Sequence, residues 1–271
     1  MYMQRKFLKL MGIYLSLFAA MTFLFGCSDS TGPATGQGQI MMKMVDAPGD
    51  YDQVNIVVTK VEVHSDVADS TSGWVTINNN TSTYDLLSLR NGANAILGDA
   101  TLDAGHYTQI RLIIGAGSNV VVNGKAYSLD ISSGAQTGIK LNHEFDIKDG
   151  QVYSLLLDFN AESSIILTGN NQYKLKPVIR VIPEVISGTI SGKITPLTVK
   201  TTVTASNGID TFTTVSDTTS GSFKLVALLA GSYNLTFTPA AYANYNDTTK
   251  ASVLVTAEQN TDIGTINLSS K

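Results

Sequence analysis

Three aspartates, Asp46, Asp50 and Asp52, form the most oxygen-rich cluster in the sequence, in a segment that also contains Pro48 and Gly49. Carboxylate oxygens are preferred ligands of Ca²⁺, so this segment could wrap a calcium ion. Its spacing differs from that of an EF-hand, and aspartate is also a favoured turn residue at the end of a strand. The sequence leaves both interpretations open, and the turn is the simpler one.

The histidines are dispersed, because His64, His106 and His143 fall in three separate segments. The sequence contains no H-E-x-x-H, G-x-S-x-G or Walker motif. His64 with Glu62, and His143 with Glu144, could hold a transition metal or exchange protons only with a third group from elsewhere. We therefore expect no catalytic residue, no cofactor and no metal ligand. A hydrolase or metal-dependent enzyme assembled from distant residues, such as paired carboxylates, is the alternative.

For several other candidate residues, a structural role is the simpler expectation. Arg111 lies between apolar neighbours on an expected strand, and we predict that it forms an ion pair with Asp158. Trp74 lies in the polar stretch 70–80, where an exposed indole could stack on a sugar. The simpler expectation is that it caps the apolar core. Gly115-Ala116-Gly117 lacks the third glycine of a dinucleotide-binding loop, so we interpret it as a turn between strands.

Cys27 is the only cysteine in 271 residues. It follows a leader with three basic residues among the first nine, and then an uncharged run from Leu10 to Gly26, a pattern typical of an export signal. The segment Leu24-Phe25-Gly26-Cys27 resembles the lipobox of bacterial lipoproteins, which implies acylation of Cys27. An uncleaved membrane-spanning segment is the alternative, and either interpretation places the rest of the chain outside the cytosol.

This interpretation predicts a signal peptide over residues 1–26 and a lipidated tether over residues 27–37, rich in small polar residues. Acyl chains would make the membrane a partner and would hold the protein in the cell envelope, in the outer membrane by preference. No cysteine then remains for disulfides, so each folded unit must be stabilised by its own apolar core.

The charge balance excludes one class of partner. Without the three basic residues of the leader, 15 basic and 22 acidic residues remain, a formal charge of −7. No basic run occurs after the leader. Binding to nucleic acid relies on clustered lysine and arginine, so we expect no nucleic-acid partner.

The elements that position these residues are short β-branched runs separated by Gly, Asn and Asp, which predict an all-β fold of two tandem β-sandwich domains, residues 38–184 and 187–271. In Val54–His64, alternation places Val57, Thr59, Val61 and Val63 on one face. A helical turn is expected within Tyr84–Leu97. The other strands expected in the first domain are Tyr107–Ile114, Val120–Leu129, Val152–Phe159 and Lys174–Ile182.

Seven short strands are expected in the second domain: Thr189–Thr195, Val199–Ser206, Phe212–Ser216, Ser222–Leu225, Tyr233–Thr238, Ser252–Thr256 and Ile263–Leu268. The segments Ile190-Ser191-Gly192-Lys193-Ile194, Gly221-Ser222-Phe223-Lys224-Leu225 and Leu228-Leu229-Ala230-Gly231-Ser232-Tyr233 resemble the carboxypeptidase regulatory-like, transthyretin-type sandwich. Gly231 permits a positive-φ turn, and we expect the Tyr233 hydroxyl to bond backbone at the corner. Such domains commonly serve as spacers or binding platforms.

The first domain is similar to a bacterial lipoprotein family known as domain of unknown function 4382. The matching segments are Asp46-Ala47-Pro48, Tyr84-Asp85-Leu86-Leu87, Leu102-Asp103-Ala104-Gly105-His106-Tyr107 and Leu157-Asp158-Phe159-Asn160-Ala161. The resemblance implies an exported β-sandwich domain and supplies no functional residues. Leu102-x-Ala104-Gly105-x-Tyr107 recurs as Leu228-x-Ala230-Gly231-x-Tyr233, which we attribute to shared turn chemistry.

Four Asp-Ser/Thr segments, at 29–31, 69–71, 217–219 and 247–249, resemble the O-glycosylation sequon of Bacteroidota. The leading functional hypothesis is a non-catalytic envelope lipoprotein that acts as a binding or scaffold module for a glycan, a matrix component or a partner protein.

Overall fold

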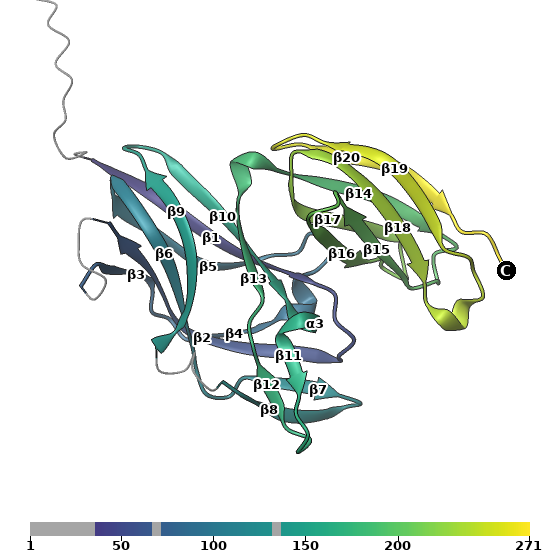
Figure 1. The fold of residues 1–271 in the computed structure, drawn as a ribbon, viewed down its shortest axis with the longest axis horizontal. Helices are drawn as coiled ribbons and strands as arrows, with labels where there is room; N and C mark the ends of the chain where they lie inside the picture. Colours follow the sequence, from purple (N-terminus) through teal and green to yellow (C-terminus); the bar gives the residue numbers. More distant parts are fainter. Residues whose placement is uncertain (1–35, 67–71, 132–136) are drawn as a thin grey trace, which may run out of the picture. The chain divides into compact units, whose positions relative to one another are not determined.

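The computed structural model describes residues 36–66, 72–131 and 137–271, and these form an all-β fold (Figure 1). The described residues belong to one compact unit. Cys27 and the segments at 29–31 and 69–71 lie outside the described residues. Within the described part of the chain, no helix is long and apolar enough to cross a membrane.

Residues 37–183 build a sandwich of two sheets. The smaller has the strand order β13-β10-β1-β5, in which β1 pairs in parallel with β10 and antiparallel with β5. Its strands are β1 (Gln37–Ala47), β5 (Ala95–Asp103), β10 (Val152–Asn160) and β13 (Ile179–Pro183). β1 therefore lies at the centre of this sheet, beside β10 and β5 (Figure 1).

The larger sheet follows the path β11-β12-β8-β7-β2-β6-β9, and β3 and β4 also pair with β2. Its strands are β2 (Gln53–Ser65), β3 (Trp74–Asn78), β4 (Ser82–Asp85), β6 (Gly105–Ile114), β7 (Asn119–Val122), β8 (Lys125–Asp130), β9 (Ile139–Ile147), β11 (Ile165–Leu167) and β12 (Tyr173–Leu175). Among the described residues of this sandwich, strands are connected by the short helices η1 (Leu86–Leu89) and α3 (Ala161–Ser164). η1 confirms the helical turn expected within Tyr84–Leu97.

The alternation expected along β2 is wrong in its first half. Val54 and Ile56 face the core together with Val61 and Val63, so the buried positions change from even to odd numbers along the strand. The pairing of β2 with β6 shifts register between Val58 and Lys60. A bulge at this point inserts one residue and exchanges the two faces of the strand, which strict alternation cannot predict.

Two of the expected strands are in fact pairs of strands. The run Val120–Leu129 is a hairpin of β7 and β8, because Asn123 and Gly124 have φ values of +51° and +73°. This left-handed pair is the preferred two-residue turn of a hairpin, and only glycine enters that conformation without steric cost. The run Lys174–Ile182 is interrupted at Pro177, which separates β12 from β13.

Residues 187–267 build the second sandwich from sheets β17-β14-β20 and β16-β15-β18-β19. All seven expected strands are present: β14 (Ser187–Thr195), β15 (Thr201–Ser206), β16 (Thr211–Val215), β17 (Ser222–Leu229), β18 (Gly231–Pro239), β19 (Thr248–Val255) and β20 (Asn260–Asn267). The short helices η2 (Glu184–Ile186) and η3 (Ala241–Ala243) precede β14 and β19.

The shared turn chemistry is confirmed in both sandwiches. The hydroxyl of Tyr233 donates to the carbonyl oxygen of Leu229 at 3.0 Å, and the hydroxyl of Tyr107 donates to that of Asp103 at 3.0 Å. Gly231 has a φ of +158°, which is positive as expected but near fully extended backbone. Each tyrosine therefore fixes the corner that leads into its strand.

The two cores are joined. Val45, Leu156 and Ile182 belong to the four-stranded sheet of the first sandwich, yet they pack in the apolar cluster of the second. They alternate with residues such as Met44 and Leu155, which face the first core. The expectation of two self-contained cores is therefore wrong here, because this sheet has apolar side chains on both faces.

Hydrogen bonds from polar side chains also connect the two sandwiches. We call this contact between the sandwiches the seam. The Asn91 side chain bonds the edge strand β17 as a neighbouring strand would: its Nδ2 donates to the Ser222 carbonyl at 3.4 Å, and its Oδ1 accepts from the Lys224 amide. On β13, Nη2 of Arg180 donates to the Thr211 carbonyl at 2.6 Å. Strand edges of the second sandwich thus gain hydrogen bonds from the first.

Candidate functional site

The carboxylates of the candidate calcium loop do not converge. Oδ1 of Asp46 accepts from the Ala161 amide at 2.9 Å, and Oδ2 of Asp52 accepts from the Gly124 amide at 2.7 Å. Asp50 is exposed, and its own amide donates to Glu162 at 2.7 Å. Among the described residues, no three His, Cys, Asp or Glu side chains are placed to share a metal ion. The geometry favours the turn-forming interpretation of these aspartates.

Two buried carboxyl groups have raised pKa values. The pKa of Asp46 is raised to about 8, mainly by burial and to a smaller extent by the nearby Asp158, while the Ala161 amide opposes the shift. Burial also raises the pKa of Asp158, against the effect of Arg180. Perturbed carboxyl pairs can perform acid–base chemistry. Asp46 and Asp158 are only 5% and 8% exposed, however, and neither lines either of the two grooves described below.

The predicted Arg111–Asp158 ion pair is wrong. Arg111 pairs with Glu62, whose Oε2 accepts from Nε at 2.8 Å and from Nη2 at 2.5 Å. Asp158 instead lies 3.6 Å from Nε of Arg180. The cause is strand register, because Glu62 is directly opposite Arg111 on β2 and β6, and Asp158 is opposite Arg180 on β10 and β13.

Trp74 covers the Glu62–Arg111 pair from outside the sheet. It is paired with His64 across β2 and β3, on the face opposite to the core-facing Val63. Its ring centroid lies 4.1 Å from the Arg111 guanidinium carbon, and the His64 ring meets it edge-on at 5.1 Å. The expectation that Trp74 caps the core is therefore wrong. Nζ of Lys140 also lies 5.7 Å from the centre of the Trp74 ring.

Removing Arg111 should destabilise the protein. Glu62 is 5% exposed and would keep only Lys60 and the Thr76 hydroxyl, each 3.4 Å away. Because a buried charge that loses its partner is poorly solvated, we expect Arg111→Ala to lower the unfolding free energy by about 3 kcal/mol in urea titrations. Lys60→Ala, on the exposed side of the same carboxylate, is the matched control and should cost less than about 1 kcal/mol. Equal losses in both variants would contradict this assignment.

The three histidines remain apart. His64 contacts the Thr108 hydroxyl at 3.3 Å, and His143 stacks near Phe145 with a ring separation of 6.2 Å. His106 lies at the surface, where its hydrogen bond of 2.8 Å to Asp146 raises the pKa of the imidazole. Burial lowers the pKa of His143. The structure brings no two of these histidines together with a shared carboxylate.

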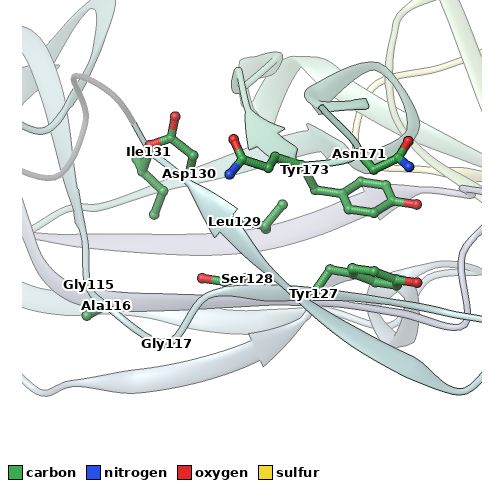
Figure 2. A pocket seen from close by; sticks show the side chains of 11 residues that line it. Gly115, Ala116, Gly117, Tyr127, Ser128, Leu129, Asp130, Ile131, Asn171 and Tyr173 are labelled. Carbon is green, nitrogen blue, oxygen red and sulfur yellow. The ribbon is translucent and has the colours of Figure 1, made fainter. Parts of the chain in front are cut away.

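An open groove of about 710 Å³ lies on the first sandwich. Three segments line it: the turn before β7, strand β8 with the residue that follows it, and the start of β12 (Figure 2). Their residues are Gly115, Ala116, Gly117, Tyr127, Ser128, Leu129, Asp130, Ile131, Asn171, Gln172 and Tyr173. We call this set the tyrosine groove. The prediction that Gly115–Gly117 forms a turn between strands is confirmed, because this segment connects β6 and β7.

The turn and both strands of the groove are held firmly. Ser118 is buried beneath the turn, where its hydroxyl accepts from the Val57 amide at 3.0 Å and donates to the Gly115 carbonyl at 3.2 Å. The Leu129 amide donates to the Ser118 carbonyl at 3.0 Å. β8 and β12 run parallel, with Leu129 opposite Tyr173. The groove is therefore held by backbone pairing and a buried hydroxyl.

Two tyrosines form the aromatic part of the groove. The rings of Tyr127 and Tyr173 lie 5.0 Å apart at an angle of 52°, and Figure 2 shows them one above the other. Nζ of Lys125 lies 5.0 Å from the centre of the Tyr127 ring. Both tyrosines are half-buried, with their inner parts packed on the first core. Each can therefore offer a fixed apolar surface to a ligand while its hydroxyl remains available.

The polar residues of the groove carry exposed hydrogen-bonding groups: the Ser128 hydroxyl, the Asp130 carboxylate and the amides of Asn171 and Gln172. A ligand with many hydroxyls and an apolar ring face would match this combination. Asp130 is the only carboxylate among the described residues that line the groove. Glycoside hydrolysis ordinarily uses two carboxylates.

The tyrosines were not identified from the sequence. The position of Tyr127 could have been found from the Asn123-Gly124 pair between two apolar runs. This pair indicates a hairpin and places Tyr127 on its second strand. The parallel pairing that brings Tyr173 to the same place connects residues more than forty positions apart and leaves no local signal.

Comparison with solved structures finds only distant similarity. The N-terminal interface mutant of a type II cohesin–X-dockerin complex from Acetivibrio cellulolyticus is 26% identical with a TM-score of 0.25, over 31% of this chain and 58% of that one. The minor pilin GBS52 of Streptococcus agalactiae is 11% identical with a TM-score of 0.24, over 86% and 96% of the two chains. A putative adhesin from Bacteroides ovatus is 9% identical with a TM-score of 0.21, over 88% and 93%.

At these TM-scores the similarities carry no inference about function, and this chain spans only 58% of the cohesin–dockerin chain. A search of curated proteins finds no match. The family described as "Domain of unknown function (DUF4382)" matches residues 37–177, which include every strand from β1 to β12 and the whole tyrosine groove. The match spans more than half of the chain and agrees with the motifs of the first sandwich: this protein belongs to the DUF4382 family.

Proposed function

We propose that this protein is a non-catalytic, lipid-anchored binding module of the bacterial cell envelope, and that its tyrosine groove binds a glycan. Acylated Cys27 would hold the folded part at the membrane, preferably the outer membrane, through the tether of residues 27–37. Residues 38–184 form the binding domain in this proposal. Residues 187–271 form a carboxypeptidase regulatory-like domain that supports it, and the corner made by Tyr233 supports that assignment.

The observation that carries the proposal is the composition of the tyrosine groove. Tyr127 and Tyr173 supply apolar ring surface, and the residues around them supply hydroxyl, amide and carboxylate groups that hydrogen-bond sugars. The rival proposal, an enzyme, would need converging acid–base or metal-binding groups. The raised pKa values that would favour it belong to Asp46 and Asp158, which lie buried outside the groove.

Affinity electrophoresis of the folded chain in gels containing neutral polysaccharides such as xylan, β-glucan or mannan tests the glycan proposal. We expect at least one polysaccharide to retard the protein, and Tyr127→Ala or Tyr173→Ala to weaken binding about tenfold, or ~1.4 kcal/mol. Tyr242→Ala is the matched control, because Tyr242 is 78% exposed in the second sandwich. Absence of retardation by every polysaccharide, or equal weakening by all three variants, would refute the glycan site.

A further inference from the structure

A second cleft, of about 650 Å³, lies away from the tyrosine groove. It is formed by the end of β9, the turn into β10, the helix η2 and the turn before β20. Its lining residues are Glu144, Phe145, Asp146, Lys148, Gln151, Val152, Tyr153, Ser154, Glu184, Val185 and Glu258. We call this set the acidic cleft.

Apolar side chains are exposed within the acidic cleft. Val152 is 59% exposed at the start of β10, and Val185 is 55% exposed in η2. Beside Val152, the ring of Tyr153 stacks on Phe145 at 5.3 Å with an angle of 8° between the planes. Exposed valines on two adjoining elements, next to a rigid aromatic pair, provide apolar surface that a partner could cover.

The lining of the acidic cleft carries more negative than positive charge. Four carboxylates, those of Glu144, Asp146, Glu184 and Glu258, line it against the single lysine Lys148. Two of the four are already paired, since Asp146 bonds His106 at 2.8 Å and Glu184 bonds Lys43 at 2.9 Å. Glu144 and Glu258 have no cationic partner among the described residues.

We propose that the acidic cleft is a docking site for a basic, partly apolar peptide segment of a partner protein. Lysine or arginine side chains of the segment would pair with Glu144 and Glu258, and its apolar residues would cover Val152 and Val185. Complementary charge selects such a partner and accelerates its association. A metal ion does not fit the cleft, because no three donors converge there among the described residues. This proposal is independent of glycan binding at the tyrosine groove.

The backbone is fixed at one edge of the cleft. Glu258 has a φ of +58°, a left-handed conformation that is uncommon for glutamate, and its amide donates to the Ser187 carbonyl at 2.7 Å. This hydrogen bond holds the turn that carries Glu258 beside η2, while the Glu258 side chain is exposed.

Fluorescence polarisation with a labelled peptide of alternating lysine and valine tests the proposal on the full-length chain. Peptides in which glutamate or serine replaces lysine are the controls for charge. We expect the lysine peptide to bind, the glutamate peptide not to bind, and the serine peptide to bind at least tenfold more weakly. Rising salt should weaken binding of the lysine peptide, because the paired charges lie near solvent.

Variants of the cleft glutamates test whether the peptide binds in the acidic cleft. Glu144→Lys and Glu258→Gln should each weaken the lysine peptide about tenfold, and each should retain the wild-type melting temperature within a few degrees because both side chains are exposed. Asp130→Lys, in the tyrosine groove, is the matched control and should leave peptide binding unchanged. Equal binding of all three peptides, or equal effects of Asp130→Lys and Glu144→Lys, would overturn the proposal. Neutral polysaccharide binding should be unchanged in Glu144→Lys, which separates this test from that of the groove.

Discussion

Replacing Asp46 with asparagine is expected to stabilise the protein by several kcal/mol at pH 9 and to change its stability little at pH 4. The native pKa of Asp46 is about 8, against an ordinary value of 3.8, because the carboxyl group is buried. The native state therefore holds the proton more tightly than the unfolded state does. The resulting stabilisation is complete below about pH 4 and is lost as the pH rises through 8, at up to ~1.4 kcal/mol per pH unit.

Asparagine removes this titration and keeps the shape of the side chain. Its carbonyl oxygen can still accept from the Ala161 amide, and it carries no charge at any pH. The other charged groups that act on Asp46 are Asp158, which disfavours its ionisation, and Arg90, which favours it. Both remain in the variant.

Urea titrations at pH 4.5, 6.5 and 8.5 measure the difference between wild type and Asp46→Asn. We expect the advantage of the variant to grow at each step. Asp130→Asn removes an exposed carboxylate as the matched control and should give a difference that is nearly independent of pH. Parallel stability curves for wild type and Asp46→Asn would show that Asp46 is not a neutral buried acid in the native state.

The second large effect is expected for Arg180→Ala. Arg180 lies 3.6 Å from Asp158, donates to the Thr211 carbonyl at 2.6 Å, and has its guanidinium carbon 4.4 Å from the centre of the Phe212 ring. Its removal strands the carboxylate of Asp158, which is 8% exposed, and breaks the contacts across the seam. We expect a loss of about 3–5 kcal/mol in the free energy of unfolding.

A double variant separates the charge from the packing. In Arg180→Met with Asp158→Asn, the buried charge is gone and the methionine can still pack on Phe212, so most of the lost stability should return. Arg180→Met alone should remain destabilised. Thermal unfolding of the three variants gives the comparison, and a double variant no more stable than Arg180→Met would contradict the role assigned to Asp158.

Features of the fold that depend on residues close together in the sequence could be predicted from local patterns. Short β-branched runs indicated the all-β fold, and all seven strands of the second sandwich lie where they were expected. The repeated Ala-Gly-x-Tyr segment indicated the corners of Tyr107 and Tyr233, because a tyrosine that bonds a carbonyl four residues upstream needs only local chain geometry.

Pairing between distant strands could not be predicted in this way. The bulge between Val58 and Lys60 exchanges the faces of β2, and it is produced by the fit to β6. The same register decides that Arg111 meets Glu62, and that Trp74 lies on the outer face. The tyrosine groove and the acidic cleft likewise combine segments far apart in the chain, so their composition is visible only in the fold.

The contact between the two sandwiches could be predicted in part. Val45 and Leu156 lie in strands with apolar residues on consecutive positions, which indicates burial on both faces. The sequence therefore contained the signal that another layer covers this sheet, and the identity of that layer required the structure.

Metabolic labelling with radioactive palmitate measures whether Cys27 is acylated and anchors the protein to the membrane, as proposed. Cells expressing the wild type and Cys27→Ser would be labelled, and the protein then separated between detergent and aqueous phases. We expect a labelled wild type in the detergent phase and an unlabelled Cys27→Ser variant. A wild-type protein that is unlabelled and remains in the aqueous phase would contradict it.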